Sequence, residues 1–296
     1  CCVGALEIES TNAASIDLSS VGSVGDDVQI HGNGALTTIN LSALDSIDAY
    51  LYVEDNDDLY DINLAGLTDI GRQFKVHANT DLMTIDLTSL IAVGDYILYT
   101  DNPVLAAISM PALERVEDYF EVESNSGMEI IEAPNLTEVG NMFKLNGNES
   151  LDTVSLDLLT EIGHTLYISS CHDLETISFP ALTNVETNLE IRNNSLIDTI
   201  DLPALEEVGS VIQIQDNALL DFVSAPVLSS VGSSLLFRNN PNLSTLILDA
   251  ISCVTDFVIE DHDLSEGDYY ALLVALTCTE EGSLNIFGSA DAAAFC

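Results

Sequence analysis

Cys171 and His172 combine a thiol with an imidazole, the pair of side chains that acts as nucleophile and base in many enzymes. The two residues are adjacent, however, and neighbours in a tight turn rarely share a hydrogen bond. Cys171 also occupies a position that other parts of the chain fill with asparagine, so we expect its thiol to face inward and His172 to face outward. No other nucleophile or acid–base pair emerges, and we therefore expect a protein that is not an enzyme.

Three groups of residues could bind cations. His31, Glu54 and His77 recur at equal intervals along the chain, which would place them side by side on successive strands, with an ordinary exposed column as the alternative. Residues 54–58 cluster carboxylates that suit weak binding of Ca²⁺ or another hard cation. Residues 261–268 resemble a calcium loop, but the glycine comes one place late and the bidentate glutamate is missing. We therefore expect no cofactor and no dedicated metal site, only weak binding of cations at the acidic surface.

The charge of the chain restricts its partners. Asp and Glu number 49 against six Lys and Arg, for a net charge of -43. Such a surface repels phosphate, which argues against nucleic acid and anionic membranes as partners. It attracts cations, basic proteins and neutral sugars, and it also keeps a protein soluble. No run of 18 apolar residues occurs, so we expect no membrane span.

A 23-residue repeat organises the chain. Equivalent positions are occupied by Leu36, Leu59, Leu82, Leu105, Met128, Leu151, Leu174, Ile197, Leu220 and Leu243. Positions 4 and 6 of each unit alternate with polar neighbours, and so do positions 16 and 18. This period of two predicts two short strands per unit, and identical strands of successive units should stack in parallel. Glycine at position 13 in seven of ten units predicts a corner with positive φ.

The repeat predicts a mainly β fold: a right-handed leucine-rich-repeat or β-solenoid with 23-residue coils and parallel sheets. We expect one solenoid domain over residues 1–296. Residues 1–12 would form an N-terminal edge strand, residues 13–242 ten repeats and residues 243–296 a C-terminal cap. A short capping helix is predicted over residues 265–277.

Position 21 is asparagine in nine of ten units and cysteine in the tenth. A buried amide at a tight corner can bond the backbone of its own and adjacent coils, so these residues predict an asparagine ladder. Its members are Asn33, Asn56, Asn79, Asn102, Asn125, Asn148, Cys171, Asn194, Asn217 and Asn240.

The repeat, with Asn or Cys at position 21, resembles the receptor L-domain branch of leucine-rich repeats. It is similar to repeats of fungal cell-wall glycoproteins and of bacterial and algal surface proteins, over residues 13–260. The resemblance implies a role in ligand binding, adhesion or cell-wall structure. It carries over no functional residues. The cysteine-rich modules that accompany L domains in animal receptors are missing, so a signalling role is not implied.

Positions 17 and 19 should form the outward face of one sheet, and their composition differs from the rest of the surface. This mixed face includes Tyr52, Lys75, Leu98, Lys144, Tyr167, Arg192, Leu236 and Arg238. Tyrosine, arginine and exposed leucine are typical of binding surfaces, although an ordinary solvated sheet face is the alternative. We expect a rigid scaffold for adhesion or for recognition of a protein or glycan ligand.

The remaining cysteines and the sequons indicate an extracellular or cell-surface protein. The candidates for disulfides are Cys1, Cys2, Cys253, Cys278 and Cys296, and the candidates for glycosylation are Asn40, Asn135, Asn193 and Asn242. Asn148 is also a sequon, but its place in the ladder predicts that it is buried. Disulfides between the ends of neighbouring molecules lead to the alternative function, a subunit that associates end to end into a filament.

Overall fold

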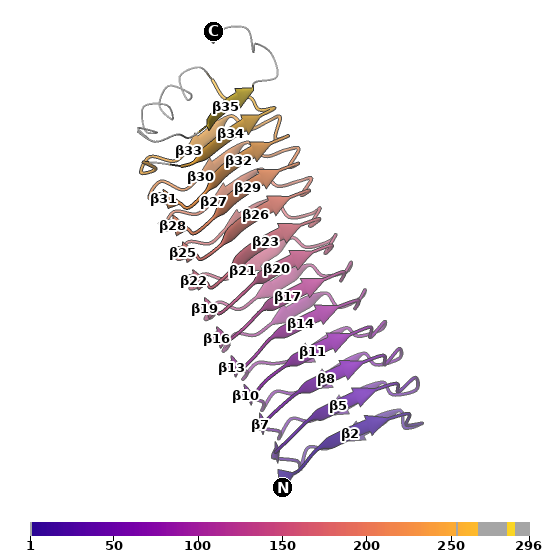
Figure 1. The fold of residues 1–296 in the computed structure, drawn as a ribbon. Helices are drawn as coiled ribbons and strands as arrows, with labels where there is room; N and C mark the ends of the chain where they lie inside the picture. The colour runs from indigo at the N-terminus through magenta and orange to yellow at the C-terminus, as the bar shows by residue number, and fades with distance from the viewer. Residues whose placement is uncertain (1, 253, 266–282, 288–296) are drawn as a thin grey trace. The chain divides into compact units, whose positions relative to one another are not determined.

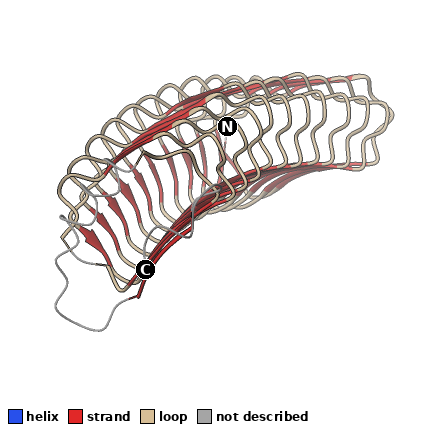
Figure 2. Ribbon diagram, turned by 90° about the horizontal axis from the view of Figure 1, so that it is seen from above, coloured by secondary structure: helices blue, strands red, loops and turns tan. Residues whose placement is uncertain are grey.

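The computed structural model of the protein describes residues 2–252, 254–265 and 283–287. The chain divides into two compact units, Cys1–Asp157 and Leu158–Cys296. Both units are β-solenoids in which successive coils place parallel strands side by side (Figure 1). Strands lie along the sides of the coils, loops join them, and no described residue is helical (Figure 2). The predicted fold class is confirmed.

The first unit contains three series of strands. The long strands are β2 (Leu6–Glu9), β5 (Val28–His31), β8 (Leu51–Glu54), β11 (Phe74–His77), β14 (Ile97–Thr100), β17 (Phe120–Glu123) and β20 (Phe143–Asn146). The two-residue strands are β1 (Cys2–Val3), β4 (Ser23–Val24), β7 (Ser46–Ile47), β10 (Asp69–Ile70), β13 (Ala92–Val93), β16 (Arg115–Val116) and β19 (Glu138–Val139). The three-residue strands are β3 (Ser15–Asp17), β6 (Thr38–Asn40), β9 (Asp61–Asn63), β12 (Thr84–Asp86), β15 (Ala107–Ser109), β18 (Ile130–Glu132) and β21 (Thr153–Ser155).

The second unit repeats the same three series. Its long strands are β23 (Thr165–Ser169), β26 (Asn188–Arg192), β29 (Val211–Gln215), β32 (Ser234–Arg238), β34 (Asp256–Glu260) and β35 (Ser283–Phe287). The two-residue strands are β22 (Glu161–Ile162), β25 (Asn184–Val185), β28 (Glu207–Val208) and β31 (Ser230–Val231). The three-residue strands are β24 (Thr176–Ser178), β27 (Thr199–Asp201), β30 (Phe222–Ser224) and β33 (Thr245–Ile247).

The pairing of strands follows the repeat. Phe74 of β11 pairs with Leu51 of β8 and with Ile97 of β14, one repeat away on either side. Most coils carry a third strand that the alternation did not predict, the short strand at positions 11 and 12. So short a strand cannot display a period of two, which is why only the backbone pairing identifies it.

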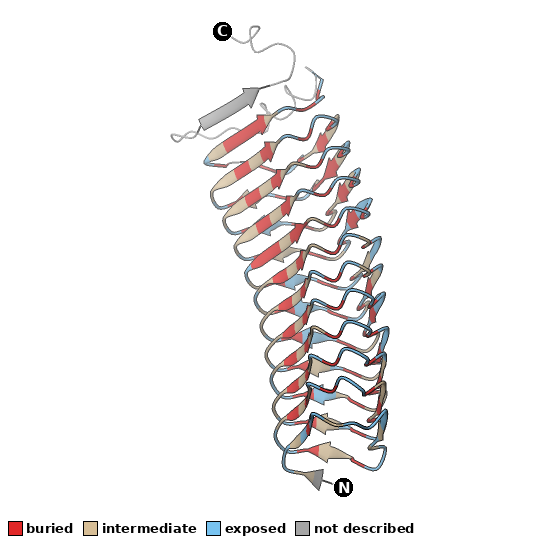
Figure 3. Ribbon diagram, turned by 90° about the vertical axis from the view of Figure 1, so that its right-hand side faces the viewer, coloured by how far each residue is buried: buried red, intermediate tan, exposed pale blue. Residues whose placement is uncertain are grey.

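The core of each unit is built from the inward positions of the strands. Along the long strands of the first unit after β2, buried residues alternate with half-buried ones (Figure 3). Phe74, Tyr99, Phe120 and Phe143 are among the largest fully buried side chains. Phe120 and Phe143 stack with ring centroids 5.3 Å apart. Each coil therefore shares its core with its neighbours, as expected for a solenoid.

Glycine at position 13 serves a different purpose from the one expected. Positive φ is recorded at Gly32 and Gly147 but not at Gly71, Gly94 or Gly140. At these three corners, an added Cβ would overlap a backbone carbonyl oxygen of the preceding coil. The expectation of a left-handed corner at position 13 is therefore wrong, and the glycine is required because two backbones approach closely.

The left-handed corner lies at position 20, immediately before the asparagine ladder. Positive φ occurs there in residues of several types, among them Asp55, Ala78, Ser124 and Asn193. Aspartate and asparagine tolerate this conformation better than most residues, and their frequency at position 20 has this cause. The variety of residue types hid the corner from the sequence.

The predicted capping helix, residues 265–277, lies outside the described residues apart from Ser265. Strand β34 pairs with β32 on one side and with β35 on the other. In the described part of the chain, no helix is long and apolar enough to cross a membrane.

Candidate binding face

The asparagines at position 21 are fully buried or nearly so and bond to one another along each unit. The side-chain amide of Asn79 donates to the carbonyl groups of Val53 (2.9 Å) and His77 (3.0 Å) and to Oδ1 of Asn102 (3.2 Å). Oδ1 of Asn79 in turn accepts from the backbone N–H of Asn56 (3.2 Å) and from its amide (3.0 Å). Each amide thus satisfies backbone groups that would otherwise be buried without partners.

Cys171 takes the place of asparagine in the second unit. Its backbone N–H donates to Oδ1 of Asn194 (2.9 Å), and its buried thiol contacts the carbonyl oxygen of Ser169 (3.5 Å). His172 is exposed, and its Nδ1 lies 3.5 Å from Oγ of Ser195. The thiol and the imidazole therefore face different surroundings, inward and outward as the repeat predicted.

The predicted binding face lies on the outer side of the long strands. Four of its residues belong to the first unit and four to the second, and all are half-buried: Tyr52, Lys75, Leu98, Lys144, Tyr167, Arg192, Leu236 and Arg238. Alternation along the strands turns these side chains away from the core.

In the first unit, the lysines of this face are neutralised by glutamates of the adjacent strand. Nζ of Lys75 lies 3.0 Å from Glu54. Nζ of Lys144 contacts both Glu121 (2.6 Å) and Glu123 (2.9 Å). Burial raises the pKa of Glu121. Burial acts on Glu123 as well, but its hydrogen bonds, that to Lys144 first, together outweigh burial and lower its pKa. These lysines therefore connect strands and do not form a cationic surface.

In the second unit, the arginines are engaged in a similar way. Arg192 places its guanidinium 4.8 Å from the ring centroid of Tyr167 and donates to its hydroxyl oxygen (2.8 Å). It also lies 3.9 Å from Glu190, and Arg238 lies 3.5 Å from Glu260. Arg192 and Tyr167 thus form a cation–π pair on the surface of the sheet.

A cluster of four tyrosines on the first unit is the most distinctive feature of this face. Tyr50 and Tyr52 stack with centroids 5.3 Å apart, and Tyr96 and Tyr119 stack at 4.4 Å with nearly parallel rings. Arg72 lies over Tyr50, 5.0 Å from the centroid, and donates to its hydroxyl oxygen (2.8 Å). We call these four tyrosines the tyrosine cluster.

Sequence reasoning identified only Tyr52 of this cluster. Tyr50, Tyr96 and Tyr119 all stand at position 15, one residue before the long strand begins. Their recurrence at one position was the signal that could have identified them. Position 15 lies outside the alternating strand positions, so the alternation did not distinguish these tyrosines.

Hydrogen bonds link Tyr52 to Asp95, the residue that precedes Tyr96. The hydroxyl of Tyr52 donates to the side-chain oxygen of Gln73, whose amide donates to Oδ2 of Asp95 (2.9 Å). Burial raises the pKa values of Tyr52, Tyr96 and Tyr119, so these phenols remain protonated at neutral pH. The cluster therefore presents aromatic surface together with hydroxyl donors and carboxylate acceptors.

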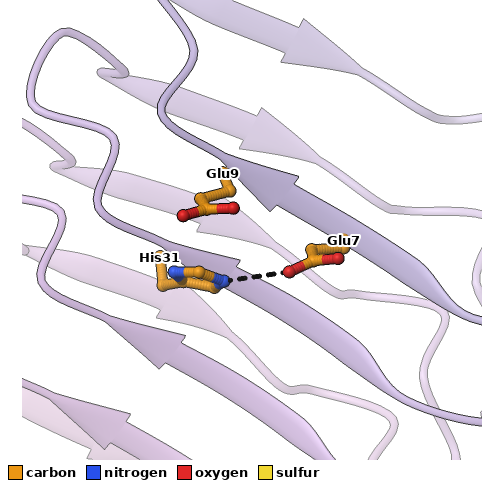
Figure 4. A group of neighbouring side chains, drawn as sticks. All are labelled: Glu7, Glu9 and His31. Carbon is orange, nitrogen blue, oxygen red and sulfur yellow. Dashed lines mark hydrogen bonds and ion pairs between the residues drawn. The ribbon is translucent and has the colours of Figure 1, made fainter.

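A second candidate is the group formed by Glu7, Glu9 and His31, whose side chains converge on β2 and β5 (Figure 4). One ligand atom of each residue lies within 4.8 Å of the others, and Nε2 of His31 is 3.4 Å from Oε1 of Glu7. Such a donor set suits a divalent cation. Both glutamates are exposed, however, and an ion pair between Glu7 and His31 accounts for the arrangement equally well.

The three residues that the sequence grouped, His31, Glu54 and His77, do lie side by side on successive strands, as predicted, but their side chains have other partners. Glu54 instead contacts Lys75, and Nδ1 of His77 lies 3.6 Å from Asp101. Glu9 pairs with His31 across β2 and β5, a register one residue shorter than the repeat. Reasoning from the repeat missed Glu9 for this reason.

The other predicted sites are placed as follows. Asn148 is fully buried, as the ladder requires, whereas Asn135, Asn193 and Asn242 are exposed and Asn40 is half-buried. Glycosylation of the latter four remains a prediction.

The disulfide candidates fall outside the described side chains: Cys1, Cys2, Cys253, Cys278 and Cys296. The segment that resembles a calcium loop, residues 261–268, also extends beyond the described residues. No protein-family model matches the chain, and a search of curated proteins found no significant relative.

Proposed function

We propose that this protein is a non-catalytic, extracellular or cell-surface scaffold that recognises a protein or glycan ligand, or mediates adhesion, through the outer face of its long strands. The observation that carries the proposal is the tyrosine cluster. Tyrosines supply large contact area at a small cost in side-chain entropy, and aromatic residues are enriched where proteins bind partners.

Three further properties support this role. Stacked coils hold the face in place because each inner strand is bonded to strands on either side, so a ligand meets a preorganised surface. The excess of carboxylates disfavours nucleic acid and anionic membranes as partners. The resemblance of the repeat to L-domain surface proteins points to the same class of role.

Binding by wild-type protein and by two variants to an array of neutral glycans, cationic polysaccharides and basic polypeptides tests the proposal. Tyr52→Ser combined with Leu98→Ser changes the face. Met83→Ser combined with Val104→Ser removes two exposed apolar side chains elsewhere and serves as the control. We expect binding by wild type and the control and its loss in the face variant. Equal binding by all three proteins, or no binding by wild type, would contradict the proposal.

The alternative function is a subunit of an extracellular filament, assembled end to end with disulfides between molecules. One observation favours it: β2 stands at the end of its sheet and pairs only with β5 among the described strands. An unpaired edge can accept a strand of another chain. Electrophoresis of native material with and without reductant separates the two functions, because the filament predicts multimers that collapse on reduction.

A further inference from the structure

Tyr96 and Tyr119 form a stacked pair at the same position of successive coils, immediately before β14 and β17. Their ring centroids are 4.4 Å apart and their planes differ by 8°. Both side chains are half-buried, so part of each ring faces solvent. The pair is therefore an aromatic surface held rigidly by the coils beneath it.

Acidic residues flank both tyrosines along the chain. Asp95 and Asp118 directly precede the two tyrosines, and Glu121 follows Tyr119 on the outer side of β17. Burial raises the pKa of Tyr119, and the negative charges of these three acids raise it further. Asp95 accepts from Gln73 (2.9 Å) through one of its oxygens. The aromatic surface thus lies in a negative potential.

Two other outward tyrosines, Tyr50 and Tyr167, hold a guanidinium of the protein itself. Arg72 lies 5.0 Å from the centroid of Tyr50, and Arg192 lies 4.8 Å from that of Tyr167. Both arginines also donate to the phenolic oxygen of the tyrosine they cover. The fold thus twice binds a guanidinium on a tyrosine of this face.

The pair formed by Tyr96 and Tyr119 differs from these two sites in how its rings are covered. Within the described residues, no arginine or lysine lies over either ring. Lys144, the basic residue on the adjoining strand, is held between Glu121 and Glu123. The aromatic and acidic parts of a cation site are present, while the cation must come from another molecule.

We propose that Tyr96 and Tyr119, with Asp95 and Asp118, bind the guanidinium or ammonium groups of a basic polypeptide. The inference rests on the proposed function and specifies its ligand. Charge complementarity selects this partner over a neutral glycan. Sugar hydroxyls would gain the aromatic contact but little from the field of the carboxylates, whereas a cation gains from both.

The test is titration of a fluorescein-labelled peptide of alternating arginine and glycine, at physiological ionic strength, followed by anisotropy. Tyr96→Leu combined with Tyr119→Leu leaves the net charge unchanged and should weaken binding about tenfold. Tyr60→Leu removes an exposed tyrosine elsewhere and should leave binding unchanged.

A second pair of variants separates the site from the general charge of the protein. Asp95→Asn combined with Asp118→Asn should weaken binding, whereas Asp152→Asn combined with Asp157→Asn removes equal charge from exposed loops elsewhere and should have a much smaller effect. Melting curves establish that each variant is folded. If the tyrosine variant binds as the Tyr60 variant does, or if the two charge variants are equivalent, the peptide binds by charge alone and the inference is wrong.

These experiments distinguish failure of this inference from failure of the proposed function. One result is loss of array-ligand binding in the Tyr52 and Leu98 variant, with peptide binding unchanged in the Tyr96 and Tyr119 variant. That result would support the binding face and refute only its specificity for cations. A neutral glycan lost on substitution of Tyr96 and Tyr119 would likewise overturn the inference.

Discussion

Asparagine at position 21 satisfies buried backbone groups of its own coil and of the preceding coil, and its amide also donates to the asparagine of the next coil. Asn102 donates to the carbonyl groups of Val76 and Thr100 (both 3.0 Å) and accepts from the backbone N–H of Asn79 (3.1 Å). All of these groups are buried or nearly so, and water cannot replace the amide without opening the coil. The recurrence of asparagine at this position therefore has a structural explanation.

Substitution of one ladder residue should be costly. We expect Asn102→Ala to lower the free energy of unfolding by about 3 kcal/mol, because it leaves several buried donors and acceptors without partners. Chemical denaturation measures the change. Asn141→Ala is the control, since its exposed amide donates to Asp118 (2.8 Å) at the surface, and its effect should stay within about 0.5 kcal/mol. Similar losses in the two variants would contradict a structural role for the ladder.

The corners between strands determine how closely successive coils can pack. Gly140 begins the turn between β19 and β20, and its backbone N–H donates to the carbonyl of Val116 (2.9 Å). An added Cβ there would overlap the carbonyl oxygen of Glu117. The two coils can therefore approach only because position 13 lacks a side chain.

Gly140→Ala should lower the free energy of unfolding by about 3 kcal/mol, because the neighbouring backbone must move to admit one methyl group. Gly34→Ala is the matched control, as nothing lies within 4 Å of the added Cβ and φ is not in the left-handed region. Its effect should be within about 0.5 kcal/mol of zero. Thermal and chemical denaturation of both variants measure the difference, and equal stability would refute the close approach.

The ion pairs between β17 and β20 should make the stability of the protein depend on pH. Burial of Lys144 is outweighed by its hydrogen bonds to Glu121 and Glu123, which raise its pKa, so its stabilising contribution is complete below its ordinary pKa and is lost only as pH rises beyond it. Glu123 has a lowered pKa, so its contribution is present above its ordinary pKa and is lost as pH falls. Both contributions are present between about pH 5 and pH 10.

Lys144→Met removes the cation and leaves the two glutamates to repel each other. Near neutral pH, the variant should be less stable than wild type by about 1–2 kcal/mol, and the difference should shrink below about pH 4 as the glutamates are protonated. Lys75→Met, which removes a pair with Glu54 alone, should have a smaller effect. Denaturation curves at several pH values measure the difference, and a constant gap across the acidic range would show that lost packing is its cause.

A net charge of -43 acts on the whole molecule. Repulsion among carboxylates is stronger in the folded chain than in the expanded unfolded chain, and salt screens it. The melting temperature should therefore rise by about 2–4 °C between low salt and physiological ionic strength, equivalent to roughly 1–2 kcal/mol.

Sodium chloride and sodium sulfate at equal, moderate ionic strength distinguish screening from exclusion of the salt from the protein surface. Screening predicts the same rise in melting temperature for both salts. A melting temperature that does not respond to either salt would contradict self-repulsion as a source of instability.

The sequence alone determined the coil, because the 23-residue period is a property of the chain. The inward apolar positions, the parallel stacking and the buried asparagines all follow from that period. A residue such as Asn79 has much the same surroundings as its equivalents in other coils, so one unit predicts the next.

Only the tertiary structure decided which side chains meet between coils. The glycine at position 13 is set by the approach of two backbones, and Glu9 meets His31 because one coil is a residue shorter. Likewise, Tyr96 stacks on Tyr119 of the next coil, and Lys144 is neutralised by the neighbouring strand. Such contacts depend on distances and rotamers in three dimensions, which a one-dimensional repeat does not contain.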